Sequence, residues 1–341
     1  MKKLVVIITI LILFIPKVNA STSSASSYIL MDSTTGRVLM SKDMHSKRLI
    51  ASITKIMTAT LAIESGKLND VVEVSPIIKK AYGSGIYIEV GEEITLKDLV
   101  YGLMLRSGND AAMMISEYIG GTTEEFVNMM NKKAKELGMK ETTFYNPSGL
   151  PTPSGNYSSA YDMALLTKYA MNSPVYQEIV KTKTYKVTTN KKTYLWHNKN
   201  KLLKYDYITG GKTGYTEESG RTLVSTANID NMPLIVVTIR DSDDWNTHIE
   251  LYNYAKDNYY KDALFYIKNN IYIPLKKSET KSLISHIKLD KKKNYQNNTV
   301  VGVDQIYLGK ELIYEEDIYI TKNKNIAKES ILSKIKKWFH D

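Results

Sequence analysis

The stretch that decides the fold is Ile50-Ala-Ser52-Ile-Thr-Lys55-Ile-Met-Thr58. It opens a run of apolar residues at helical spacing that stops at Gly66, namely Ile53, Ile56, Met57 and Leu61. This spacing predicts a helix with Ser52 in its first turn and Lys55 one turn further on. Because residues three apart share a helix face, we expect the serine hydroxyl and the lysine amine to lie together.

Two more short motifs follow in order, Ser107-Gly-Asn109 and Lys212-Thr-Gly214. Ser107 lies between two predicted helices, over residues 95–105 and 110–119. A loop between helices can project both the Ser107 and Asn109 side chains. Lys212 begins a region of short β runs, so the third motif is expected on a strand.

Order and context separate these motifs from other copies of the same letters. Ser-x-x-Lys recurs at Ser278, Ser285 and Ser333, in lysine-rich segments where a solvated face is the simpler interpretation. Ser-Gly-Asn recurs at Ser154, inside Pro151-Thr-Pro-Ser-Gly-Asn156. The prolines and glycine explain this last copy as a turn.

The first twenty residues predict a signal peptide. Lys2 and Lys3 precede an apolar run over residues 4–15, and Val18-Asn-Ala20 supplies small residues for cleavage. A membrane-spanning helix would need about 20 apolar residues, and Pro16 and Lys17 end the run too early. We therefore expect an exported enzyme on the outer face of the cytoplasmic membrane or in the cell wall.

Composition limits the chemistry. The chain has no cysteine and only 5 histidines, without paired ligand spacing, so we expect no metal and no cofactor. The formal charge of +10 falls to +7 when Lys2, Lys3 and Lys17 leave with the leader. Such a surface favours anionic wall polymers or lipid head groups, and no nucleic-acid motif accompanies it.

Hydrophobic patterns outline the larger domain, residues 21–270. A hairpin is predicted over residues 28–40 and a helical middle follows, including a helix over residues 123–137. Adjacent antiparallel strands are predicted on either side of Asp230-Asn231, and a last helix over residues 245–266. Helices are therefore expected to bracket an antiparallel sheet drawn from both ends of the domain, an α/β (α+β) fold.

Two further units are predicted beyond Pro274. Alternating runs indicate a small β domain over residues 275–321. Residues 322–341 predict an amphipathic helix with lysines on one side and an apolar face ending in Trp338-Phe339. Such a helix lies on a membrane surface or docks as a terminal helix on its own domain; the lysines and the aromatic pair favour the membrane.

Longer segments of the sequence resemble those of one protein family. They are the segments over residues 28–36, 50–58, 105–112 and 210–216, in the order of the three motifs. The chain resembles low-molecular-weight penicillin-binding proteins of the D-alanyl-D-alanine carboxypeptidase family, peptidase family S11. The resemblance runs from about residue 28 to about residue 266 and implies a serine β-lactamase-like fold, with the site between a sheet flanked by helices and an α-helical subdomain.

The resemblance also implies roles. Ser52 would attack the carbonyl of the terminal D-Ala-D-Ala bond of a peptidoglycan stem peptide, and penicillin would acylate the same hydroxyl. Lys55 would be the base, its proton loosened by burial and by Lys212 as a second cation. Ser107 would relay a proton to the leaving amine, and Asn109 would hold the substrate backbone.

The third motif would bind the substrate's carboxylate. Lys212, Thr213 and Thr216 would receive it, with Gly214 allowing close approach of the backbone. The backbone N–H groups of Ser52 and Tyr215 would form the oxyanion hole. Two departures stand out: Ile50 replaces a proline common in relatives, and Arg240 does not align with a carboxylate-binding arginine.

Two other functions share some of these features. A class A serine β-lactamase uses the same motifs but adds a glutamate on a loop between the second and third, whereas no glutamate occurs here between Glu141 and Glu178. A non-catalytic wall-binding protein could keep the fold, but the complete set of polar motif side chains argues against it. The sequence leaves both carboxypeptidase and transpeptidase activity open, because it does not show whether the acceptor is water or an amine.

Overall fold

The computed structural model describes residues 23–151, 154–264, 271–276, 278–279, 282–289 and 300–319. The predicted signal peptide and the predicted tail helix lie outside these residues. Within the described segments, no helix is long and apolar enough to cross a membrane.

A five-stranded antiparallel sheet forms the centre of the larger unit, in the order β2-β1-β11-β10-β9. Strands from both ends of this unit pair, with Ser27 opposite Ile239. Asp230 and Asn231 join β10 to β11 with positive φ at both residues, as a tight hairpin turn requires. The sheet ends at β9, and one edge of that strand has no partner strand among the residues that the structure describes. The strands are β1 (Ser27–Asp32), β2 (Val38–Lys42), β9 (Ile208–Thr216), β10 (Gly220–Ile229) and β11 (Met232–Ile239).

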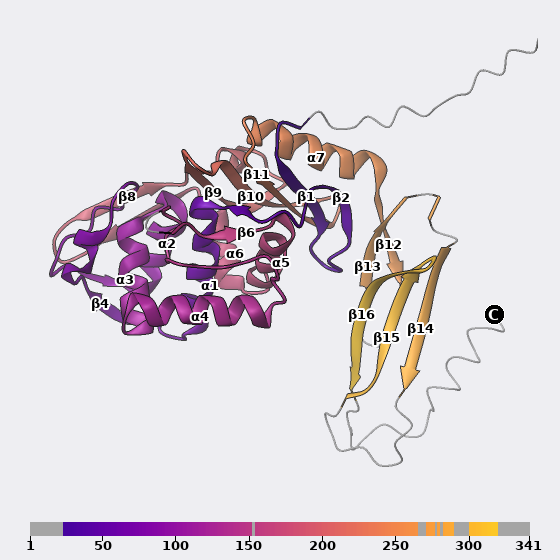
Figure 1. Cartoon of the computed structure of the whole chain (residues 1–341), viewed down its shortest axis with the longest axis horizontal. Helices are drawn as coiled ribbons and strands as arrows, with labels where there is room; N and C mark the ends of the chain where they lie inside the picture. The colour runs from indigo at the N-terminus through magenta and orange to yellow at the C-terminus, as the bar shows by residue number, and fades with distance from the viewer. Residues whose placement is uncertain are drawn as a thin grey trace, which may run out of the picture.

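The two faces of the sheet pack against different helices (Figure 1). Helix α7 (Asp244–Asn258) covers one face, and a helical body covers the other. Because side chains alternate along a strand, β1 supplies both cores: Leu30 packs on the α7 side and Ile29 on the other. The helical body comprises α1 (Lys55–Glu64), α2 (Leu96–Arg106), α3 (Asn109–Gly120), α4 (Thr123–Glu136), α5 (Ala160–Ala170) and α6 (Pro174–Lys181). The predicted antiparallel sheet with helices on both faces is confirmed.

Short elements connect these layers. Three 3-10 helices lie among the described residues, η1 (Ala51–Thr54), η2 (Pro76–Lys80) and η3 (Lys201–Lys204). The two-stranded ladders pair β3 (Arg48–Leu49) with β6 (Tyr157–Ser158), β4 (Val71–Glu73) with β5 (Glu93–Thr95), and β7 (Thr184–Thr188) with β8 (Thr193–His197). The β7–β8 hairpin lies at the end of the larger unit that is far from the small β sheet (Figure 1).

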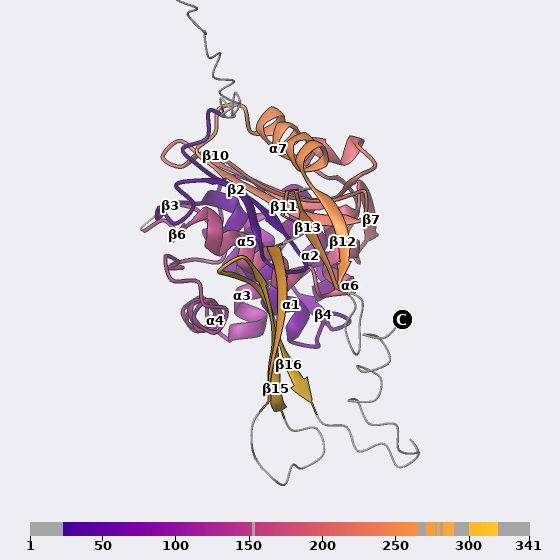
Figure 2. The same ribbon diagram turned by 90° about the vertical axis from the view of Figure 1, so that its right-hand side faces the viewer.

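The small β unit projects away from the helical body (Figure 2). Its antiparallel sheet contains β14 (Leu283–Leu289), β15 (Val300–Leu308) and β16 (Glu311–Tyr319), and a second ladder pairs β12 (Tyr260–Leu264) with β13 (Ile271–Leu275). Ile273 and Leu275 of β13 share a buried cluster with Ile306 and Ile313. The domain boundaries themselves stay a prediction.

Arg37 links the two units. Its guanidinium lies 3.0 Å from Glu279 Oε1 and also donates to the carbonyl of Pro274. The ring of Tyr259 lies 5.7 Å from the guanidinium carbon, within the range of a cation–π contact. The β1–β2 turn is thereby joined to the small β unit by charge and hydrogen bonding, and to the end of α7 by the ring contact.

Two predicted boundaries differ from the structure. The helix predicted over residues 245–266 ends at Asn258, because Tyr260 instead begins a strand that pairs with Leu275. That pairing partner lies beyond the helix in sequence, so local spacing could not reveal it. Ser52 lies in the 3-10 turn η1 rather than in the first α-helical turn, which begins at Lys55.

Candidate active site

The first motif brings a hydroxyl and an amine together. Ser52 lies in η1 and Lys55 begins α1, and Lys55 Nζ donates to Ser52 Oγ at 3.0 Å. Ala51 has a positive φ of 48°, a conformation uncommon for a residue with a side chain, directly before Ser52. The chain therefore turns sharply into the motif and presents Ser52 at the start of the helix.

Lys55 is fully buried, and its amine donates hydrogen bonds to oxygen acceptors. Besides Ser52, its Nζ donates to Asn109 Oδ1 at 2.8 Å and to the carbonyl of Ser148 at 2.5 Å. Burial, followed by the charges of Lys212 and Lys199, lowers the pKa of Lys55 well below its ordinary value. The lowered pKa favours the neutral form of the Lys55 amine, which is the form that can accept a proton.

The second motif joins two helices. Ser107 caps α2 with a left-handed φ of 64°, and Gly108 precedes α3, which begins at Asn109. This geometry confirms the predicted inter-helix loop and turns both side chains inward, with Ser107 5% and Asn109 3% exposed. Asn109, at the start of α3, thus contacts the amine of Lys55, at the start of α1.

The third motif lies on the edge strand β9. Lys212 is buried, and its Nζ donates to Ser107 Oγ at 3.2 Å and to the Thr213 carbonyl at 2.7 Å. A side chain at Gly214 would place its Cβ 2.4 Å from Thr222 Oγ1 and 2.9 Å from the backbone nitrogen of Ser52. Glycine is required there because β9 passes directly against the nucleophile's backbone.

One cleft of about 290 Å³ joins these parts. Among the expected site residues, its walls contain Ser52, Ser107, Thr213, Gly214 and Tyr215. Lys55 and Lys212 lie beneath these walls with their amines on Ser52 and Ser107.

Thr216 does not line this cleft. Its hydroxyl donates to Ser219 Oγ at 2.9 Å, and its backbone nitrogen donates to the same oxygen at 3.1 Å. Thr216 therefore closes the turn between β9 and β10 in this structure. Arg240, left out of the expected site, donates to the carbonyl of Glu218 instead.

Sequence reasoning missed a third lysine in the cleft. Lys199 follows β8, and its Nζ donates to Ser84 Oγ at 3.1 Å. Burial and Lys199 together lower the pKa of Lys212 to about 7. The sequence around Lys199 carries no motif, and only its position shortly before the strand of the third motif could have drawn attention to it.

Arg221, Asp244 and Trp245 form the far end of the cleft. Arg221 pairs with Asp244 through two hydrogen bonds, from Nε at 3.0 Å and from Nη2 at 2.5 Å, and its guanidinium carbon lies 5.6 Å from the Trp245 ring centre. These residues are distant in sequence from every motif except the third. Only the pairing of β10 with β9 and the start of α7 bring them to the cleft.

The loop behind the nucleophile is ordered by asparagines. Asn156 Oδ1 accepts from the nitrogens of Tyr145 and Asn146, and its Nδ2 donates to Thr54 Oγ1. This second Ser-Gly-Asn copy thus supports η1 structurally, and its Ser154 is exposed. Within the described part of this loop, the group that contacts Lys55 is the Ser148 carbonyl rather than a carboxylate.

Comparisons with known proteins identify relatives of this chain. Residues 16–243 match the family model of D-alanyl-D-alanine carboxypeptidases, peptidase family S11, and residues 251–325 match the model of the C-terminal domain of penicillin-binding protein 5. The D-alanyl-D-alanine carboxypeptidase DacF of Bacillus subtilis is 44% identical over 224 residues, which are 62% of this chain and 56% of that relative. DacC of Escherichia coli is 36% identical over 238 residues, 65% of this chain and 58% of that relative. The chain thus spans less than two thirds of the length of these curated relatives.

Solved structures show the same fold. Penicillin-binding protein 5 from Haemophilus influenzae superposes with a TM-score of 0.72 at 26% identity, covering 88% of this chain and 97% of that one. Penicillin-binding protein 6B from Escherichia coli superposes with a TM-score of 0.69 at 28% identity, covering 87% and 96%. With the motif geometry and the family match over residues 16–243, the chain belongs to the D-alanyl-D-alanine carboxypeptidase family, peptidase family S11.

Proposed function

We propose that this protein is a serine D-Ala-D-Ala carboxypeptidase that removes the terminal D-alanine from peptidoglycan stem peptides. The observation that carries the proposal is the pair Ser52 and Lys55: a hydroxyl 3.0 Å from a fully buried amine whose pKa is lowered. A serine needs such a base, and no histidine lines this cleft among the described residues.

Acylation follows from this pair. Ser52 Oγ bonds to the carbonyl carbon of the penultimate D-alanine while its proton passes to Lys55 Nζ. The N–H groups of Ser52 and Tyr215 stabilise the oxyanion, which the close approach at Gly214 supports. The C–N bond then breaks, and the leaving amine takes through Ser107 the proton that Lys55 received from Ser52, which makes Lys55 neutral again; Lys212 holds Ser107 at 3.2 Å.

The acyl ester on Ser52 is then hydrolysed. Water adds to the ester carbonyl and gives up a proton to the neutral Lys55 amine. The C–O bond to Ser52 then breaks, and Lys55 returns that proton to Ser52 Oγ as the shortened peptide leaves. Lys212 and Thr213 bind the substrate's terminal carboxylate at the β9 edge, and Asn109 holds the peptide backbone. Thr216 would join them only if the turn at Ser219 released its hydroxyl.

Penicillin enters the same site as an acylating inhibitor. A class A β-lactamase is disfavoured because the loop that would carry its deacylating glutamate presents the Ser148 carbonyl to Lys55. A non-catalytic wall-binding protein is disfavoured because burying two lysines beside a serine opposes folding, and binding alone would not need them.

We further propose export and membrane attachment. Residues 1–20 would direct export as a signal peptide, and residues 322–341 would anchor the enzyme to the outer face of the cytoplasmic membrane. Both segments lie outside the described residues, so these proposals depend on the sequence pattern alone.

The test incubates the purified chain with two compounds, a D-Ala-D-Ala peptide and a fluorescent penicillin. The purified chain should release D-alanine from a D-Ala-D-Ala peptide in many turnovers, while fluorescent penicillin stays covalently bound. Ser52→Ala, the control, should do neither. Rapid repeated hydrolysis of penicillin would move the protein to the β-lactamases, and failure to label at all would support the non-catalytic alternative.

A further inference from the structure

The rim loop, residues 81–92, holds the asparagine of the second motif. It contains no helix or strand. The backbone nitrogen of Asn109 donates to the Ser84 carbonyl at 2.7 Å, and Asn109 Nδ2 donates to the Tyr82 carbonyl at 2.5 Å. The remaining polar atom of this side chain, Oδ1, accepts from Lys55. The orientation of Asn109 toward Lys55 is therefore set by two carbonyls of the rim loop.

Helix α3 holds the rim loop from one side. The Asp110 carboxylate accepts from the backbone nitrogens of Ile86 and Tyr87, with the shortest contact 2.7 Å at Tyr87. Tyr87 adopts a φ of 60°, and its side chain is 72% exposed. A left-handed conformation is strained for a residue with a side chain, and a ring as exposed as this one gains little stabilisation from burial to offset the strain. The loop therefore needs external contacts to hold this shape.

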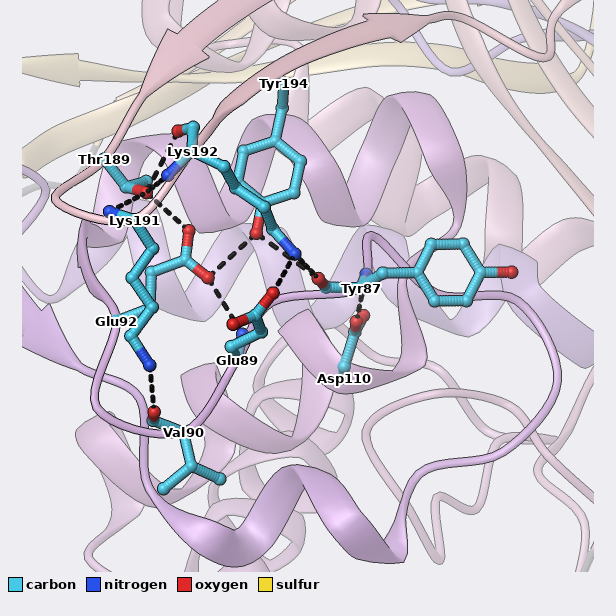
Figure 3. Close-up of polar contacts among 9 residues, drawn as sticks. All are labelled: Tyr87, Glu89, Val90, Glu92, Asp110, Thr189, Lys191, Lys192 and Tyr194. Atoms are coloured by element: carbon cyan, nitrogen blue, oxygen red, sulfur yellow. Dashed lines mark hydrogen bonds and ion pairs between the residues drawn. The ribbon is translucent and has the colours of Figure 1, made fainter.

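The β7–β8 hairpin supplies those contacts from the other side (Figure 3). Lys192 Nζ donates to the Tyr87 carbonyl at 2.9 Å and to Glu89 Oε1 at 2.6 Å. Tyr194 OH donates to Glu92 Oε2 at 2.8 Å and lies 3.3 Å from the same Tyr87 carbonyl. One backbone carbonyl of the strained residue is thus held by two side chains of β8 and its turn.

Glu92 is the buried centre of this contact. It is fully buried, and its carboxylate accepts from the Thr189 hydroxyl at 2.6 Å, from the Glu89 nitrogen at 2.8 Å and from Tyr194. The Glu92 carboxylate therefore accepts hydrogen bonds from uncharged donors of both the hairpin and the rim loop. Such a network fixes the separation of hairpin and loop because losing any donor leaves a buried charge poorly solvated.

We propose that Lys192 and Tyr194 are positioning residues for acylation, acting through the rim loop on Asn109 and Lys55. Their contacts fix the Tyr87 carbonyl, the Asp110 carboxylate fixes the adjacent nitrogens, and the Tyr82 and Ser84 carbonyls then orient Asn109. The inference rests on the proposed function, in which Asn109 and Lys55 serve the reaction of Ser52.

The chain offers a matched pair of variants. Lys191 and Lys192 are neighbours on the same turn, but Lys191 Nζ donates to the Val90 carbonyl, beyond the part of the loop that meets Asn109. We would compare Lys192→Met and Tyr194→Phe with the control Lys191→Met. Lys192→Arg keeps a cationic donor and serves as the rescue variant.

The experiment measures two quantities with fluorescent penicillin on the full chain: the limiting rate of labelling and the fraction labelled at completion. Lys192→Met and Tyr194→Phe should slow labelling about tenfold or more, because small displacements of reacting groups have large effects on rate. Their final labelled fraction should equal that of the wild type. Lys191→Met should be unaffected, and Lys192→Arg should recover most of the rate.

Two results would overturn the inference while leaving the proposed function intact. Equal rates in wild type, Lys192→Met and Tyr194→Phe would show that the hairpin contacts do not reach Asn109. A reduced labelled fraction at an unchanged rate would show a role in folding only. If the wild type itself failed to label, the proposed function would fail first and this inference with it.

Discussion

Lys55 Nζ lies 3.0 Å from Ser52 Oγ even though the two residues belong to different kinds of helix. Side chains three residues apart eclipse in a 3-10 turn, whereas in an α-helix they are offset around the axis. The turn η1 therefore brings the amine more directly over the hydroxyl than the predicted α-helical start would. This contact is the basis of the first prediction.

Lys55→Arg should abolish rapid acylation. Arginine keeps the positive charge but does not lose its proton at accessible pH, so the loss should be at least the ~10²-fold typical of a missing general base. The measurement is the rate of covalent labelling by fluorescent penicillin. Near-normal labelling of this variant would rule out Lys55 as the base, and the exposed Lys201→Met serves as a control for general effects of changing a lysine.

Lys199→Met should move the pH dependence of acylation to higher pH. Lys55 must be neutral to accept a proton, so the rate rises with pH through its pKa, and Lys212 must be charged to bind a carboxylate, so the rate falls as pH passes its pKa of about 7. Lys199 lowers the pKa of both groups, so removing its charge raises both. The efficiency of penicillin acylation between pH 5 and 10 would test this, with Lys201→Met as the control. An unchanged optimum would contradict the prediction.

His248 should make stability depend on pH. It is fully buried between Ser225 Oγ at 2.6 Å and Thr238 Oγ1 at 3.1 Å, and burial lowers its pKa from 6.5 to about 3. As the pH falls, His248 is protonated in the unfolded chain before it is protonated in the folded protein. The contribution of His248 to folding stability is therefore fully present above pH 6.5 and declines as the pH falls toward 3. The slope is at most about 1.4 kcal/mol per pH unit.

The measurement is urea unfolding at several pH values. His248→Gln should unfold more easily at pH 7 yet lose less stability than the wild type between pH 6.5 and pH 4. The exposed His197→Gln is the matched control and should keep the wild-type slope. Identical slopes in all three proteins would exclude His248 as the source.

Removal of the tail should separate membrane attachment from chemistry. A chain ending at Lys324 should keep full penicillin labelling but stay in the supernatant with anionic vesicles, whereas the longer chain should sediment with them. Each apolar side chain of the tail contributes about 1.5–3 kcal/mol on full burial, and less at shallow depth, which suits reversible attachment. If both chains partition alike, the tail docks on its own protein.

The motif residues could be predicted because each depends on a short run of sequence. Ser52 and Lys55 are three residues apart, and Ser107 and Asn109 are two residues apart at the junction of α2 and α3, so local spacing places each pair. Lys199 could not be predicted in this way, because its contact with Ser84 joins residues more than a hundred positions apart. The same holds for Arg221, which reaches the cleft through the pairing of β10 with β9 and its ion pair with Asp244.

The roles predicted for the motif residues remain predictions, and Thr216 shows why geometry must supplement resemblance. The motif places it near the carboxylate site, yet its hydroxyl is bonded within the β9–β10 turn. The helix predicted to residue 266 failed for a different reason: a strand partner that arrives later in the chain, β13, outweighed local spacing. A local turn thus decided the position of the Thr216 hydroxyl, whereas long-range strand pairing decided the end of the helix.

The unpaired edge of β9 has a consequence for self-association. An exposed edge strand is normally a template on which other chains add strands and aggregate. Here the Ser107 and Ser84 side of the cleft stands opposite that edge, and the cleft between them holds only about 290 Å³. A strand that belongs to a folded sheet is much wider than a single extended chain. We therefore expect the opposite wall of the cleft to keep another copy of the protein from pairing with β9.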